Sequence, residues 1–367
     1  MNKIPFVDLK AQYSEIKEEV NIAINNILDN TSFIMGKPVE EFENAFAAYC
    51  NAKNCIGVSS GTSALYIALK AIGIKEGDEV IVPSHTFIAT AEAALELNAK
   101  VIFAEVDKET FTIDPNSIKE KITNNTKAII PVHLYGQPCN MDPIIEIAKE
   151  HNLTIIEDCA QSHGAEYKGK KVPISTVGCF SFYPGKNLGA YGDAGAIVTN
   201  DEEIAEKARM LINHGRKKGD KYIHTILGTN HRIDALQAAI LNVKLKHIDS
   251  WNEKRRNNAK IYNNLLKDTL PIPKEEEYAK HVYHLYVIKA KNRDKLRDFL
   301  KEKGISSGIH YPIPLHLQPA LKDTENNLNI TEDICKNIVS LPMFPELTEE
   351  QINYIAETIK EGIKNDI

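Results

Sequence analysis

The 367-residue sequence has no long run of apolar residues. Nothing in it approaches the roughly 18 consecutive apolar residues that a membrane-spanning helix needs, so we expect no membrane span. The opening residues, Met1-Asn2-Lys3-Ile4-Pro5, contain no apolar core of a signal peptide. These two features predict a soluble protein of the cytoplasm.

Cysteine is also scarce, and the cysteines present show neither a CxxC pair nor the spacing of zinc ligands. Most stand beside apolar residues, which predicts buried free thiols in a reducing compartment and no metal site. The six are Cys50, Cys55, Cys139, Cys159, Cys179 and Cys335.

The sequence also lacks an excess of positive charge: it contains 44 Lys and Arg and 50 Asp and Glu, which gives a net charge of −6. This balance predicts no broad basic surface, and therefore no nucleic-acid partner. Hydrophobic residues make up 43% of the chain, as in ordinary globular proteins. The length is sufficient for a large domain and a smaller one.

Short apolar runs alternate with helical patterns through the first two thirds of the chain. Each run is followed by a turn rich in small or polar residues, and then by apolar residues spaced three or four apart. This alternation predicts an α/β fold with a mostly parallel central sheet. The expected strands include residues 55–58, 79–83, 101–104 and 128–132, and helices are expected over residues 143–151 and 202–213.

The last third of the chain has a different pattern. One long helical pattern from Leu236 to about Leu266 predicts a connector helix. A strand over 283–288, a helix over 293–303 and a final amphipathic helix over 349–364 predict a smaller C-terminal α+β domain. We therefore expect two domains, 1–245 and 246–367.

Two expected strands near the middle of the chain end in polar clusters. The first supplies Asp158 and Gln161, and the second supplies Ser181 and Lys186 within a glycine-rich loop. The carboxyl ends of strands are where ligands bind in α/β sheets. A carboxylate that can hold a pyridinium nitrogen and a lysine that can form a Schiff base are what pyridoxal 5′-phosphate (PLP) requires of a protein. For Lys186 viewed in isolation, a solvated loop lysine remains the commoner alternative.

The residues around these two clusters carry a resemblance. Residues 157–165 read EDCAQSHGA and residues 180–189 read FSFYPGKNLG. Both segments resemble the DegT/DnrJ/EryC1/StrS family of nucleotide-sugar aminotransferases. The resemblance covers nearly the whole chain and implies a fold-type I, aspartate aminotransferase-like large domain. It also implies PLP as cofactor, L-glutamate as amino donor and a homodimer with composite active sites.

The resemblance assigns expected roles residue by residue. Lys186 and Asp158 are the expected catalytic pair, Gln161 faces the ring 3-oxygen, and Phe87 stacks on the ring. On local sequence alone, the turn after residues 55–58 is equally compatible with simple helix capping. The family resemblance makes Gly61 and Thr62 of this turn, together with Ser181, the expected phosphate ligands, joined by Asn230 of the neighbouring subunit. We expect Arg232 to form a structural ion pair.

The segment 183–195, YPGKNLGAYGDAG, resembles the subgroup that acts on dTDP-3-keto-6-deoxyhexoses. The expected product is a dTDP-3-amino-3,6-dideoxyhexose, with Tyr183, His310 and Tyr311 as candidate substrate contacts. His310 is equally compatible with an ordinary loop histidine. UDP-linked 3-keto (hexuronate) and 4-keto sugars are alternative substrates. Another PLP reaction and a binding-only regulatory role are alternative functions, although a regulatory role predicts loss of the lysine or the carboxylate.

Overall fold

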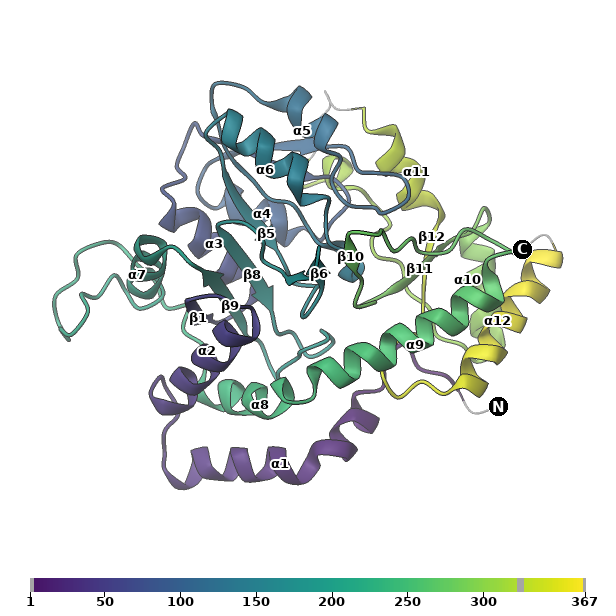
Figure 1. Cartoon of the computed structure of the whole chain (residues 1–367), viewed down its shortest axis with the longest axis horizontal. Coiled ribbons are helices and arrows are strands. Elements are labelled where there is room, and N and C mark those ends of the chain that lie inside the picture. The colour runs from purple at the N-terminus through teal and green to yellow at the C-terminus, as the bar shows by residue number, and fades with distance from the viewer. Residues whose placement is uncertain (1–2, 322–326, 366–367) are drawn as a thin grey trace.

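A computed structural model describes residues 3–321 and 327–365. Its centre is a seven-stranded sheet with the order β1-β9-β8-β5-β4-β2-β3 (Figure 1). Strands β3, β2, β4, β5 and β8 are mutually parallel, whereas β9 runs antiparallel to both of its neighbours. The predicted mostly parallel α/β sheet is confirmed. The strands are β1 Asn54–Val58, β2 Glu79–Pro83, β3 Lys100–Ala104, β4 Thr126–Ile129, β5 Thr154–Asp158, β8 Val177–Ser181 and β9 Gly195–Thr199.

Helices cover both faces of this sheet because successive strand residues point to opposite sides. Val80 and Val82 of β2 pack with the helices of one face, whereas Ile81 packs on the other. The first face carries α3 Gly61–Ala71, α4 Ala89–Leu95 and α7 Glu202–Leu211. The second carries α2 Lys37–Tyr49, α5 Pro115–Lys121, α6 Met141–Glu150 and α8 Ala235–Leu245. The N-terminal helix α1 Leu9–Asp29 packs against α8.

The long helical pattern predicted from 236 to 266 is two helices in the structure. α8 ends at Leu245, and α9 Ile248–Leu266 starts after a break at Lys246 and His247. The prediction of one helix was wrong because both segments keep the same apolar spacing and neither Gly nor Pro marks the break. α9 contributes Ile248 to the core beside the large sheet and Tyr262 to the C-terminal core.

The C-terminal part contains more regular structure than predicted. β11 Tyr286–Lys289 pairs antiparallel with β12 Ile338–Leu341, which sequence analysis missed together with α11 Asn329–Asn337. The predicted helices are confirmed as α10 Arg293–Glu302 and α12 Glu349–Lys364. Remaining short elements are η1 Leu134–Gly136, β6 Glu166–Tyr167, β7 Lys170–Lys171, β10 Ala279–Lys280 and η2 Leu315–Leu317. The domain boundary at 245/246 stays a prediction.

The N-terminal arm packs on the C-terminal part of its own chain. The backbone N–H of Ile4 donates to the Gly304 carbonyl at 2.9 Å, and the Ile4 side chain is buried in the C-terminal core. The start of the arm is therefore held by its own chain. Other apolar residues near α1, such as Ile22 and Phe33, remain exposed.

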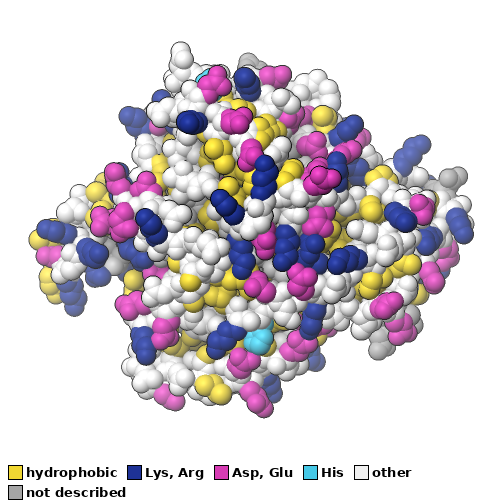
Figure 2. All heavy atoms as spheres, in the orientation of Figure 1, with side chains coloured by type: hydrophobic (Ala, Val, Ile, Leu, Met, Phe, Trp, Pro, Cys, Tyr) yellow, Lys and Arg dark blue, Asp and Glu magenta, His cyan; other side chains and the backbone are white. Residues whose placement is uncertain are grey.

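All six cysteines are free and buried, as predicted. Within residues 3–321 and 327–365, no helix has the length and apolar character needed to cross a membrane. In the view of Figure 2, Lys and Arg side chains are interspersed with Asp and Glu across the molecule.

Candidate active site

A cavity of about 530 Å³ lies where β5 and β8 end and where β1 turns into α3. Ten of the eleven predicted site residues line it, although they come from segments spread over 250 positions of the chain. Asn230 is the exception. The ten are Gly61, Thr62, Phe87, Asp158, Gln161, Ser181, Tyr183, Lys186, His310 and Tyr311.

Asp158, the last residue of β5, presents a buried carboxylate to this cavity. One carboxylate oxygen accepts the Thr90 hydroxyl at 2.9 Å and the other accepts the Ala160 backbone N–H at 3.1 Å. Burial raises the pKa of Asp158, while these two hydrogen bonds and the nearby charge of Lys186 oppose the rise. The carboxylate is therefore fixed in position while part of it remains available to a ligand.

Lys186 lies in the loop between β8 and β9, which is held on both sides of the lysine. Its backbone N–H donates to the Tyr183 carbonyl at 2.9 Å, and the next residue, Asn187, is buried and donates to Asn252 at 2.9 Å. Burial lowers the pKa of the Lys186 amine to about 8, and the Asp158 carboxylate acts in the opposite direction. About a tenth of the amine is therefore neutral and nucleophilic at pH 7, far more than for an ordinary lysine.

The turn from β1 into α3 forms an anion cradle. Ser60 caps the helix by accepting the Ser63 N–H at 3.1 Å, which leaves the first amides of α3, those of Gly61 and Thr62, without an acceptor inside the helix. A Cβ atom on Gly61 would stand 2.6 Å from the Ser181 Cβ, so only glycine allows this close approach. Free amides at a helix N-terminus favour a phosphate group.

Gln161 has a defined orientation at the cavity wall. Its Oε1 accepts the Tyr135 backbone N–H at 2.7 Å, and its Nε2 donates to the Tyr311 hydroxyl at 3.2 Å. Because a backbone N–H can only donate, the Gln161 amide nitrogen must be the atom on the Tyr311 side. Its second N–H can donate to an oxygen in the cavity.

Aromatic side chains also line the cavity. The Phe87 ring lies 5.7 Å from that of Tyr311, and the side chain is 53% exposed. His310 is anchored by its Nδ1 to the Ser340 hydroxyl at 2.8 Å. Tyr183 is 60% exposed at the mouth. These rings offer flat surfaces to a heterocycle or a sugar.

Sequence reasoning missed Thr90 and Ser60, which position Asp158 and α3, respectively. Ser60 could have been found, because a serine immediately before a helical run is a typical N-cap. Thr90 carried no such signal: its contact with Asp158 spans 68 positions.

Asn230 is exposed and does not line the cavity of its own chain. It pairs with Asn213 in an isolated bridge next to His231, whose carbonyl accepts the Ser59 N–H at 2.8 Å. The predicted ion pair of Arg232 is not formed among the described residues, because Arg232 Nη1 donates to the neutral amide oxygen of Asn213 at 2.8 Å.

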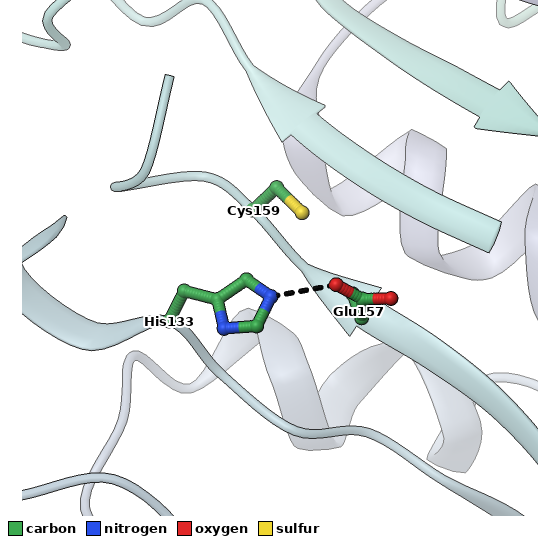
Figure 3. A group of neighbouring side chains, drawn as sticks. All are labelled: His133, Glu157 and Cys159. Carbon is green, nitrogen blue, oxygen red and sulfur yellow. Dashed lines mark hydrogen bonds and ion pairs between the residues drawn. The ribbon is translucent and has the colours of Figure 1, made fainter. Parts of the chain in front are cut away.

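One trio of possible metal ligands, His133, Glu157 and Cys159, lies together at the end of β5 (Figure 3). The ring nitrogens of His133 and the carboxylate of Glu157 already form hydrogen bonds within the protein. His133 Nε2 lies 2.8 Å from the Glu157 carboxylate, and its Nδ1 accepts the Cys139 backbone N–H at 3.0 Å. Glu157 also accepts two backbone amides and a hydroxyl from the segment 174–175. The trio is a structural network that anchors the end of β5.

Comparison with known proteins agrees with this geometry. The family model of the DegT/DnrJ/EryC1/StrS aminotransferases matches residues 14–360.

The chain belongs to the DegT/DnrJ/EryC1/StrS aminotransferase family. It is 47% identical over 366 residues to a "pleiotropic regulatory protein" of Geobacillus stearothermophilus, covering 98% of both chains. It is 45% identical over 359 residues to the dTDP-3-amino-3,6-dideoxy-alpha-D-galactopyranose transaminase of Aneurinibacillus thermoaerophilus, covering 97% of this chain and 98% of that one. The crystal structure of DesV from S. venezuelae superposes with a TM-score of 0.96 at 42% identity, covering 98% of each chain.

Members of this family depend on PLP. The cavity fits that group on three counts that are independent of the family. The α3 amides suit its phosphate, the fixed Asp158 carboxylate suits a protonated ring nitrogen, and Lys186 supplies an amine of lowered pKa.

Proposed function

We propose that this family member transfers an amino group from L-glutamate to a nucleotide-linked 3-keto sugar. The proposed substrate is a dTDP-3-keto-6-deoxyhexose and the product a dTDP-3-amino-3,6-dideoxyhexose. The observation that carries the proposal is the juxtaposition of Lys186 and Asp158 in one cavity beside a phosphate cradle. Similarity over the whole chain to a transaminase named for a dTDP-3-amino-3,6-dideoxy sugar supports the choice of substrate.

PLP, when bound, supplies the electron sink that lets an amino group and a proton leave one carbon and join another. In our proposal, the Asp158 carboxylate would keep the ring nitrogen protonated by accepting a hydrogen bond from its N–H group. Thr90 and Ala160 hold that carboxylate in place. Burial raises the pKa of Asp158 while these hydrogen bonds lower it, so removing them would weaken its ionised form.

Lys186 is the proposed proton carrier. With a pKa near 8, its amine can both accept a proton from the donor's α-carbon and return it to the acceptor carbon. Gln161 directs a free N–H into the cavity for the ring 3-oxygen, and the α3 amides with Ser181 hold the phosphate. One cavity serves donor and acceptor in turn, which predicts ping-pong kinetics.

Tyr183, His310 and Tyr311 are the proposed sugar or nucleotide contacts. They lie together on the cavity wall, and the His310 ring is fixed by Ser340. We further propose that the enzyme is a cytoplasmic homodimer in which Asn230 reaches the phosphate of its partner's cofactor. The exposure of Asn230, away from its own cavity, supports this.

A binding-only regulatory role is the second candidate, favoured by the name of the Geobacillus relative. Such a role needs neither a nucleophilic lysine nor its carboxylate partner. Both are present and lie at one cavity, which favours catalysis.

The direct test is Lys186→Ala. We expect its transamination rate to fall at least about 1000-fold, because the variant loses both the covalent anchor and the proton carrier. Release of 2-oxoglutarate is measured with dTDP- and UDP-linked 3-keto and 4-keto sugars. Lys170→Ala, which alters an exposed lysine, is the control and keeps full rate.

Wild-type rate in Lys186→Ala would overturn the proposed role of this residue. Faster turnover of a UDP-linked or 4-keto sugar would shift the substrate to one of the alternatives. Failure of the wild type with every keto sugar would favour the regulatory role or another PLP reaction.

A further inference from the structure

A second recess of about 230 Å³ opens beside Lys186 and has no role in the site described so far. Lys186, Gln161, Tyr183 and Tyr311 form its wall toward the main cavity. Its other side is formed by α9 and by the chain around His284 and Met343. A small molecule in this recess would therefore lie next to the reactive amine.

Arg255 of α9 lines this recess and is 3% exposed. Its Nη1 nitrogen faces backbone carbonyls only: Met343 O at 2.8 Å, Tyr283 O at 3.2 Å and His284 O at 3.3 Å. Carbonyl contacts position a guanidinium without neutralising its charge, and the Glu346 carboxylate attracts that charge without forming an ion pair of 4 Å or less with it.

The other edge of the same guanidinium is unpaired. Arg255 Nε is buried without a hydrogen-bond partner, and no hydrogen bond of the described residues involves its Nη2. Within residues 3–321 and 327–365, no carboxylate lies within 4 Å of Arg255. Nε and Nη2 together form the edge that binds a carboxylate through two parallel hydrogen bonds.

We propose that Arg255 binds a carboxylate of the amino-acid donor, with the recess as the donor subsite. This inference rests on the proposed function and adds the residue that distinguishes an amino acid from other amines. The recess places a carboxylate beside Lys186, where the donor's nitrogen must react. A nucleotide diphosphate is the other anion that this edge could bind, so the test separates the two.

The test uses the holoenzyme and observes the donor half-reaction alone, through the change in cofactor absorbance on addition of L-glutamate without sugar. In Arg255→Lys we expect the half-saturating L-glutamate concentration to rise at least about tenfold, because a lysine cannot form the two parallel bonds. Affinity for dTDP, measured by calorimetry, stays unchanged. Arg256→Lys is the matched control: Arg256 neighbours Arg255 on α9 but bonds Glu275 and the His281 carbonyl, and it keeps wild-type values for both ligands.

Chemical protection of the wild-type enzyme gives the same information even if Arg255→Lys fails to fold. 2-Oxoglutarate should slow the modification of Arg255 by phenylglyoxal, read by mass spectrometry, whereas dTDP should not. Protection by dTDP alone, or an unchanged L-glutamate requirement in a folded Arg255→Lys, would overturn the inference. A different result would contradict the proposed function itself: the wild-type enzyme would then aminate no keto sugar.

Discussion

At the scale of single residues, burial explains the chemistry of Lys186. The amine lies inside a cavity instead of in solvent, and the loss of hydration lowers its pKa to about 8. The unfolded chain still binds a proton at this lysine up to about pH 10. Protein without cofactor therefore gains stability from this group as pH rises between these two values, because the unfolded state then holds more protons.

The lowered pKa makes a kinetic prediction. In cofactor-free protein, we expect the rate at which Lys186 captures PLP to rise about tenfold per pH unit and to level off near pH 8. The rate is followed by the growth of visible absorbance at a series of pH values. Lys168, whose pKa is raised by its hydrogen bond to Asp142, is the internal comparison and should react with an amine reagent only at higher pH. A Lys186 profile still rising beyond pH 10 would refute the effect of burial.

At the scale of elements, two adjacent residues at the end of β5 have different roles: one faces the cavity and the other holds the strand in place. Successive side chains of a strand point to opposite faces. Asp158 accordingly faces the cavity, while Glu157 bonds His133 and the segment 174–175 on the other side. The network around Glu157 anchors the strand end that carries Asp158.

The last helix, α12, offers a test of local sequence logic. Thr348 and Gln351 form a capping box, in which the Thr348 hydroxyl accepts the Gln351 N–H at 3.2 Å and the Gln351 side chain accepts the Thr348 N–H at 3.0 Å. Thr348→Ala should destabilise the first turn by about 1 kcal/mol. Amide exchange in that turn should then quicken about fivefold, as measured by mass spectrometry. Thr348→Ser, which keeps the hydroxyl, should exchange as the wild type does.

At the scale of the whole molecule, the proposed composite site predicts complementation between two defective subunits. Lys186→Ala and Asn230→Ala should each be impaired at low PLP concentration. In a mixed dimer, one site regains both residues. An equal mixture that exchanges subunits should therefore recover about a quarter of wild-type activity. Transaminase assays before and after mixing measure this.

If Asn230 acts within its own chain, mixing restores nothing, because neither subunit then holds an intact site. Mixing each variant with itself under the same conditions is the control for recovery caused by handling.

Sequence alone determined the features that depend on neighbouring residues. The apolar spacing of α12 and the short apolar runs of β2 and β5 gave the right elements, because periodicity follows from local geometry. The resemblance carried by residues 157–165 and 180–189 named seven of the ten predicted residues that the structure brings to one cavity; the other three, Tyr183, His310 and Tyr311, were candidate substrate contacts.

Only the tertiary structure decided what distant segments do to one another. Residues far apart in sequence form the hydrogen bond from Thr90 to Asp158, the backbone bridge between Ile4 and Ile305, and the pairing of β11 with β12. They also create the surroundings that leave one edge of Arg255 unpaired. No local pattern encodes such contacts. The lowered pKa of Lys186 belongs with them, because it depends on how much of the folded chain excludes water from one amine.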